Sequence, residues 1–231
     1  MNITKTALRL FTVAILAITA ASCNDSSNEI PDNEAWNLVT FAAQNESGST
    51  FTFQTGAFTP EITLTSTRTF DTEKVKVGTR MVIRYRTLTG ADPNTSGPID
   101  LLGFMAVHNA ELLKGTASEY NKFASEMVEV NSVWITGKWL NFDITANVDK
   151  EPKTFKLVAD ESTLDSKQPT VYLLFETDDI YDATAKRCYA SFDIDWLWKD
   201  PRYTGITLKV ANGSGPHSFE FEARPSITPM N

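Results

Sequence analysis

The chain has 231 residues, of which 42% are hydrophobic, and its 21 Lys and Arg stand against 29 Asp and Glu. This proportion of apolar residues suffices for one large core or two small ones, so it excludes an intrinsically disordered chain. The formal net charge of −8 argues against a sequence-independent grip on nucleic acid, because such a grip needs clustered Lys and Arg. We therefore expect no nucleic-acid partner.

Residues 1–22 have the layout of a secretory signal peptide. Lys5 and Arg9 are followed by an apolar run at 10–21 that ends in small residues. The run is shorter than the ~18 residues of a membrane-spanning helix. It leads directly into Cys23, so the stretch resembles the lipobox of bacterial lipoproteins, whose peptidase cuts before a diacylglycerol-modified cysteine. We expect lipidation at Cys23, with an ordinary signal peptide that ends near a cysteine as the alternative.

Residues 23–34 are polar and acidic and cannot bury a face, so they are typical of a flexible tether. An acidic stretch directly after a lipidated cysteine is similar to the export signal of surface lipoproteins in Bacteroidota. We therefore predict an outer membrane lipoprotein whose contact with the membrane is the lipid anchor, and which faces either the cell surface or the periplasm.

Alternation of apolar and polar residues with period two recurs after the tether, and helical spacing hardly appears. It is clearest in five stretches, each of which predicts a strand with one buried and one solvated face: 51–53, 81–86, 140–145, 206–210 and 218–222. The continuous apolar run at 171–175 predicts a strand that is covered on both faces. Many short strands separated by turns indicate an all-β protein, either a sandwich or a barrel.

The stretch 188–198 predicts a strand whose even positions are Cys, Ala, Phe, Ile, Trp and Trp. Cys188 should therefore lie on the apolar face as a small buried hydrophobe rather than act as a nucleophile. Trp196 and Trp198 would end the strand, with Tyr203 after the next turn. These three aromatic residues are a candidate ligand-binding set for a sugar or a peptide, although core packing explains the tryptophans more simply.

A domain boundary is expected near residue 129. Thr116 and Glu119 form a capping-box pattern that fits a short helix between 115 and 124, and strand-like sequence resumes at 129. The pattern divides the chain into a domain at 35–128 and a domain at 129–231.

Six segments carry a resemblance to a known family. They are VWITGKWLNF at 133–142, TFKLV at 154–158, VYLLFE at 171–176, YASFD at 189–193, ITLKV at 206–210 and FEF at 219–221. Their order and spacing, over roughly residues 130–224, resemble the C-terminal domain of NigD-like lipoproteins. The departures are Trp139 and the long acidic segment after Phe175.

This resemblance implies a fold but supplies no activity. It implies a C-terminal β-sandwich at 129–231 that follows an N-terminal OB-like barrel at 35–128. We expect a non-enzymatic envelope protein that serves as a binding or accessory module, and the family's link to bacteriocin production is one of gene context alone. The partner would be an envelope protein, a peptide or a glycan, and a glycan-binding surface lipoprotein is the first alternative.

The sequence holds no strong catalytic or cofactor signature. The common hydrolase, nucleotide and zinc motifs are absent, so we expect no enzyme, no catalytic residues, no cofactor and no metal. His108 and His217 are the only histidines, and both are predicted to be structural. Asp193 and Asp195 would share one strand face, which keeps a carboxylate-dependent glycoside hydrolase as a weaker alternative.

The acidic segment from Asp178 to Asp182 has two interpretations. Its carboxylates could bind calcium, but the ligand order of an EF-hand is missing. A solvated hairpin loop without a bound cation is the simpler interpretation, with Lys186 or Arg187 facing the carboxylates across the hairpin.

Overall fold

The computed structural model describes residues 33–88, 90–116, 128–148, 154–176, 184–212 and 215–222. The expected signal peptide, Cys23 and most of the tether lie outside these ranges, as do most of the predicted short helix and the whole segment Asp178–Asp182. Within the described ranges, no helix has the length and apolar character that crossing a membrane requires.

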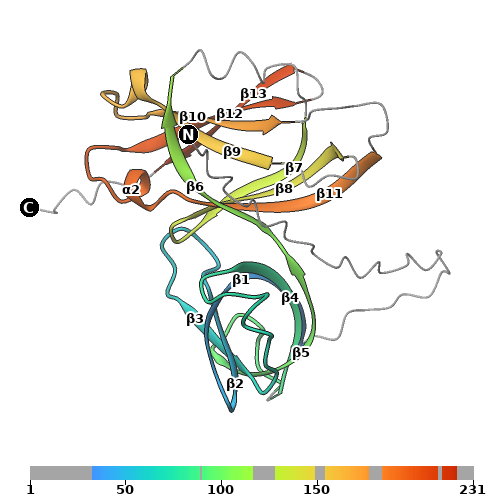
Figure 1. Cartoon of the computed structure of the whole chain (residues 1–231). Coiled ribbons are helices and arrows are strands. Elements are labelled where there is room, and N and C mark those ends of the chain that lie inside the picture. The colour runs from blue at the N-terminus through green and yellow to red at the C-terminus, as the bar shows by residue number, and fades with distance from the viewer. Residues whose placement is uncertain are drawn as a thin grey trace, which may run out of the picture. The chain divides into compact units, whose positions relative to one another are not determined.

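The first five strands form a closed barrel in the order β1-β2-β3-β5-β4 (Figure 1). They are β1 (Glu34–Asn45), β2 (Gly48–Phe53), β3 (Ile62–Ser66), β4 (Arg80–Thr87) and β5 (Gly97–Ala106). All neighbouring pairs are antiparallel except β3 and β5, which are parallel. A five-stranded barrel with one out-of-order strand is the architecture of OB folds, as the resemblance implies.

Alternation on β4 positions the barrel core. Met81, Ile83 and Tyr85 are buried with the inward residues of the other strands, whereas Arg84 and Arg86 face outward and both pair with the carboxylate of Glu34 on β1. The core cluster consists of Val39, Phe41, Phe51, Phe53, Leu64, Met81, Ile83, Tyr85, Ile99 and Leu101. The predicted inward and outward faces of this strand are confirmed over residues 81–86, except that Val82 on the outward face is also buried.

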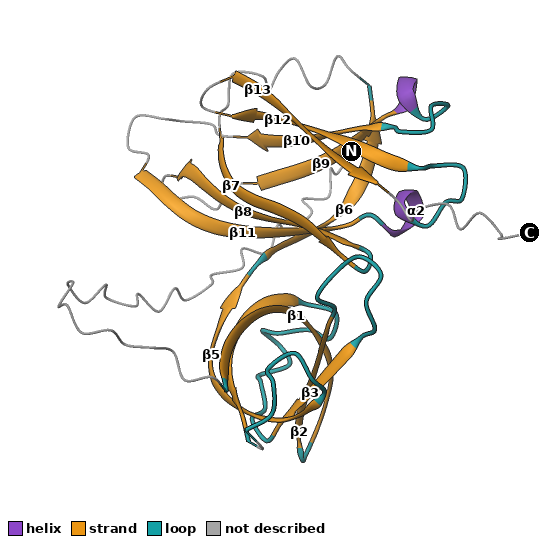
Figure 2. Cartoon of the chain, turned by 180° about the vertical axis from the view of Figure 1, so that it is seen from behind, coloured by secondary structure: helices purple, strands orange, loops and turns teal. Residues whose placement is uncertain are grey.

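The remaining strands form one eight-stranded sheet in the order β10-β9-β6-β11-β8-β7-β12-β13. They are β6 (His108–Gly115), β7 (Val128–Thr136), β8 (Trp139–Val148), β9 (Thr154–Asp160), β10 (Thr170–Glu176), β11 (Thr184–Asp193), β12 (Gly205–Asn212) and β13 (Gly215–Glu222). An additional parallel pairing of β10 with β12 curls the sheet around its core. The only described helical elements are the 3₁₀ turn η1 (Glu161–Thr163) and the single turn α2 (Asp195–Trp198), so the all-β class is confirmed (Figure 2).

β6 belongs to the eight-stranded sheet, although it precedes the boundary that the sequence predicts near residue 129. It pairs in parallel with β9 and with β11. The two sheets therefore divide between Ala106 and His108, where β5 ends and β6 begins. Sequence reasoning placed the boundary after a segment of weak strand character and so assigned β6 to the barrel.

Two strands of this sheet are covered on both faces. On β10, Val171, Leu173 and Phe175 enter the main core while Leu174 packs with Val158 on the opposite face, as the unbroken apolar run predicts. On β8, however, the polar residues Asn141 and Asp143 are buried as well. The expectation that this strand has one solvated face is therefore wrong.

A glycine turn joins β7 to β8. Gly137 has a φ of +56° at the first of two turn residues, which is where a type II′ hairpin turn needs glycine. A Cβ atom at this position would lie 1.9 Å from Oε1 of Gln54, and the N–H of Gly137 donates to the carbonyl of Gly56 at 3.2 Å. The turn therefore requires glycine, whereas the contact with Gln54 alone does not, because the end of a flexible side chain can shift.

Candidate binding site

The three aromatic residues of the predicted ligand-binding set do not share one surface. β11 ends at Asp193, and the N–H groups of Leu197 and Trp198 donate to the carbonyl of Ile194 at 3.0 and 2.8 Å. Residues 195–198 are thus a helical turn and not the continued strand that the alternation predicts. The turn buries Leu197 and Trp198 and leaves Trp196 38% exposed.

Core packing accounts for two of these three residues. The ring of Trp198 stacks on Phe58, with centroids 5.9 Å apart and planes 15° from parallel. Tyr203 is buried, and its hydroxyl donates to the carbonyl of Leu164 at 3.1 Å. Trp196 alone remains exposed to a ligand. Its indole N–H donates to the carbonyl of Leu112 at 3.1 Å, and the amine of Lys114 lies 4.8 Å from its ring centroid.

The carboxylates Asp193 and Asp195 are each engaged with a lysine. Asp193 pairs with Lys138 at 2.5 Å and accepts the N–H of Asp195 at 3.0 Å, and Asp195 pairs with Lys199 at 2.5 Å. Because α2 begins at Asp195, the two side chains do not share a strand face. The basis for a glycosidase pair on β11 is therefore lost.

Arg187, one of the two cations expected to face the acidic segment, binds a carboxylate of β8, and the segment itself lies outside the described residues. The guanidinium holds Asp143 on β8 through two hydrogen bonds, from Nε at 2.8 Å and from Nη2 at 2.5 Å. These bonds keep the pKa of Asp143 below its usual value. Among the described residues, no group of three or more His, Cys, Asp or Glu side chains could hold a metal ion.

His108 and Cys188 have structural surroundings. Nε2 of His108 lies 2.8 Å from the carbonyl of Phe155, and burial lowers the pKa of the imidazole. Cys188 packs against the sheet core, and burial raises the pKa of its thiol to about 11, opposite to the shift of an activated nucleophile. Both agree with the predicted apolar positions, while the side chain of His217 lies outside the description.

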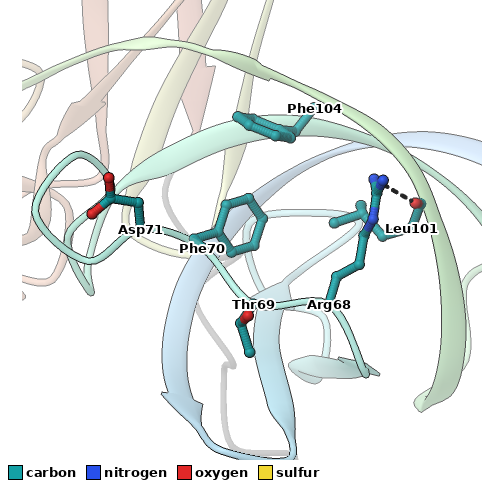
Figure 3. Close-up of a pocket in the computed structure, with 6 residues that line it drawn as sticks. All are labelled: Arg68, Thr69, Phe70, Asp71, Leu101 and Phe104. Carbon is teal, nitrogen blue, oxygen red and sulfur yellow. Dashed lines mark hydrogen bonds between the residues drawn. The ribbon is translucent and has the colours of Figure 1, made fainter.

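A depression of about 320 Å³ lies on the barrel (Figure 3). Figure 3 shows the rings of Phe70 and Phe104 beside each other, at a centroid distance of 5.0 Å, and the guanidinium of Arg68 directed at the carbonyl of Leu101, 3.1 Å away. Asp71 pairs with Lys74 at 3.1 Å. The charged groups of this depression are thus engaged with neighbours, and most of its remaining lining is apolar.

A second hollow, which we call the junction groove, has a volume of about 270 Å³. The groove forms where β1 and β2 separate. Their pairing runs from Thr40 opposite Thr52 to Asn45 opposite Gly48, so the part of β1 before Thr40 and the chain after Thr52 are not hydrogen-bonded to each other. Strands β7 and β11 supply the remaining wall. The lining residues are Trp36, Asn37, Leu38, Phe53, Gln54, Thr55, Val82, Trp134, Thr136 and Tyr189.

The junction groove combines aromatic rings with neutral polar groups. Trp36 is 48% exposed, and Trp134 and Tyr189 are half-buried. Within the described part of the chain, no hydrogen-bond partner is seen for the indole N–H groups of either tryptophan or for the hydroxyl of Tyr189. The nearby cations are already paired, since Arg84 lies 5.6 Å from the Trp36 ring and binds Glu34, and Arg187 binds Asp143.

A buried polar network supports one side of the groove. Arg80, the first residue of β4, is 1% exposed, and its guanidinium donates to Thr40 Oγ1 at 3.2 Å and to Asn141 Oδ1 at 3.1 Å. Asn141 in turn donates to Oγ1 of Thr136 at 2.9 Å and accepts from Ser191 at 2.7 Å. Because the arginine comes from the barrel and the asparagine from the eight-stranded sheet, the network joins the two and fixes the Thr136 side chain.

Burial sets the electrostatics of Arg80. It lowers the pKa of the guanidinium to about 9, and no carboxylate of the described residues pairs with it. The side chain instead stacks over Trp139, with the guanidinium carbon 5.0 Å from the ring centroid. Sequence reasoning missed both the network and the groove. The available signal was Val82, an apolar residue on the strand face that otherwise carries arginines.

Comparison with known proteins identifies the eight-stranded unit. A family model described as the NigD-like C-terminal beta sandwich domain matches residues 111–223. The chain therefore carries a NigD-like C-terminal β-sandwich domain. The match begins within β6, in agreement with the pairing of that strand. No curated protein matches the chain.

Solved structures share the fold over most of the chain. A protein of unknown function from Bacteroides vulgatus aligns with a TM-score of 0.67 at 14% identity, over 84% of this chain and 92% of that one. A NigD-like immunity protein from Bacteroides caccae aligns with a TM-score of 0.56 at 15% identity, over 82% and 97%. A candidate lipoprotein from Bacteroides fragilis aligns with a TM-score of 0.58 at 14% identity, over 84% and 99%. The resemblance to NigD-like proteins is thus confirmed, and these similarities concern the fold.

Proposed function

We propose that the chain is a lipid-anchored protein of the outer membrane that binds a ligand on the cell surface and has no enzymatic activity. The observation that carries the anchoring is the signal-like stretch of residues 1–22 that runs directly into Cys23. Two or more acyl chains give stable anchoring, and the polar tether would hold the folded part away from the bilayer. The candidate lipoprotein from Bacteroides fragilis shares the fold, and at 14% identity it supports the fold alone.

A binding role is favoured over catalysis by the state of the charged groups. The carboxylates Asp143, Asp193 and Asp195 each sit in an ion pair. The junction groove is lined mainly by aromatic and neutral polar side chains. A catalytic carboxylate pair would instead need perturbed pKa values within a cleft. We attach no bacteriocin role to the proposal, since 15% identity to a NigD-like immunity protein supports the fold alone.

The anchoring is tested by fractionation of cells that express the full chain. Wild-type protein should sediment with membranes, and Cys23→Ala should appear in the soluble fraction. The matched control is Cys188→Ala, which removes the other cysteine and should leave the protein with the membranes. Cys23→Ala protein that stays membrane-bound to the wild-type degree would refute the lipid anchor.

Surface exposure is tested separately by protease treatment of intact cells. Degradation of the wild-type protein in intact cells supports the surface location, and protection that is lost only after the outer membrane is opened would place the protein on the periplasmic side.

A further inference from the structure

We infer that the junction groove is a binding site for a neutral oligosaccharide. This inference rests on the proposed function, because it gives the proposed binding module a site and a ligand class. The predicted set of Trp196, Trp198 and Tyr203 does not provide such a site, because only Trp196 is exposed.

The first argument is the pairing of ring faces with neutral hydrogen-bonding groups. A pyranose ring presents C–H groups on its faces and hydroxyls around its edge. In the groove, the rings of Trp36, Trp134 and Tyr189 lie among the hydroxyls of Thr55 and Thr136 and the amides of Asn37 and Gln54. The NH₂ groups of these amides donate to the hydroxyl of Tyr85 and to the carbonyl of Thr59, which leaves their oxygens for a ligand. An aromatic wall with a few placed polar groups is the usual composition of small-ligand sites.

The second argument is charge. The lining holds no carboxylate, amine or guanidinium. Of the cations at the rim, Arg187 pairs with Asp143, and Arg84 shares the carboxylate of Glu34 with Arg86. A charged ligand would therefore find no opposite charge within the lining itself. An uncharged ligand with many hydroxyl groups fits this lining better than an acidic glycan or a peptide with charged ends.

The third argument is the rigidity of the walls. Thr136 is held by Asn141, which Arg80 and Ser191 fix in turn, and Gln54 is held by its bond to the carbonyl of Thr59. Side chains that are fixed before binding lose less conformational freedom when the ligand arrives.

The position of the groove also differs from the usual ligand face of OB barrels, which lies on β2 and β3 and the loops after β1 and β4. Here the turn after β1 is only Glu46 and Ser47, too short to reach over a ligand, and the groove uses the start of β1 and the end of β2. The adjacent sheet contributes Trp134, Thr136 and Tyr189 in place of barrel loops.

The test is binding of neutral linear hexasaccharides of glucose, mannose, galactose and xylose to the purified full chain, followed by calorimetry. We expect at least one of them to bind, with an affinity that falls about tenfold or more in Trp36→Ala, which corresponds to ~1.4 kcal/mol. Trp36→Phe should recover most of the loss because it restores an aromatic face. Trp36 is half-exposed, so its removal should leave the fold intact, as circular dichroism will check.

The matched control is Trp196→Ala, which removes another exposed tryptophan that also lies beside a cation, Lys114, but outside the groove. It should bind like wild type. The inference is overturned if none of the four neutral hexasaccharides binds, if Trp36→Ala binds as tightly as wild type, or if uronic-acid oligomers or a capped peptide of residues 24–33 bind in their place. Fractionation of Cys23→Ala does not depend on the groove, so failure of this test and failure of the lipid anchor are distinguishable.

Discussion

The buried Arg80–Asn141 hydrogen bond offers a sharp test of how the barrel is held to the eight-stranded sheet. Asn141→Ala removes the acceptor from the sheet, and Arg80→Met removes the charge from the barrel while it keeps an unbranched side chain of similar reach. A double-mutant cycle of these two substitutions isolates the interaction between them.

The magnitude follows from the burial of the guanidinium. The fall of its pKa from 12.5 to about 9 corresponds to a desolvation cost on the order of 5 kcal/mol. Two hydrogen bonds from a charged donor return ~1.5–3 kcal/mol each, and the desolvated contact with Trp139 returns ~2 kcal/mol. The returns sum to ~5–8 kcal/mol against that cost, so Arg80→Met alone should lower the unfolding free energy by no more than about 3 kcal/mol.

The interaction energy between Arg80 and Asn141 measures this one contact rather than the net effect of removing the guanidinium. In the wild-type background, Asn141→Ala leaves a buried charge without its acceptor, whereas in the Arg80→Met background that penalty disappears. We expect a coupling energy of ~1.5–3 kcal/mol from urea unfolding followed by tryptophan fluorescence. Thr40→Val is the control, because Thr40 is only half-buried and water can replace its hydroxyl, so its coupling to Arg80 should be smaller. A coupling energy below ~0.5 kcal/mol between Arg80 and Asn141 would refute the argument.

Two further predictions concern ionisable groups. Because Arg187 lowers the pKa of Asp143 in the folded state, this carboxylate stabilises the fold above its unfolded pKa of 3.8, and the contribution is lost as the pH falls through the lower folded value. Asp143→Asn should therefore lose stability less steeply than wild type in acid unfolding below pH 4, and equal slopes would contradict the assignment. Because burial raises the pKa of Cys188 to about 11, iodoacetamide at pH 8 should alkylate this thiol at least tenfold more slowly in native Cys23→Ala protein than in urea, as mass spectrometry would follow; equal rates would show an accessible thiolate.

Local patterns predicted those parts of the fold that depend on neighbours in sequence. The period-two alternation of Met81, Ile83 and Tyr85 placed them in the barrel core, because successive side chains of a strand point to opposite faces. The run of five apolar residues from Val171 to Phe175 predicted a strand with two covered faces for the same reason.

The end of β11 shows where such patterns fail. Even positions remain apolar through Trp198, but Leu197 interrupts the alternation, and the chain turns into a helix at Asp195. The turn is set by two contacts: the carboxylate of Asp193 accepts the N–H of Asp195, and the N–H of Ile194 donates to the carbonyl of Lys138, 56 residues earlier in the chain. The first contact was open to prediction from the Asp-x-Asp spacing, whereas the second exists only in the folded sheet.

The junction groove could not be predicted because it marks the edge of a contact between distant strands. Arg80, Val82, Arg84 and Arg86 share one face of β4, and their exposure rises from 1% and 6% at the first two to 46% and 45% of the side chain at the last two. The eight-stranded sheet therefore covers this face of β4 at Arg80 and leaves it in solvent at Arg84 and Arg86. Val82 lies between these positions and lines the junction groove, so the groove lies at the edge of the covered surface. Since Arg80 reaches Asn141 across 61 residues of sequence, the shape of the groove depends on the same long-range contact that the double-mutant cycle measures.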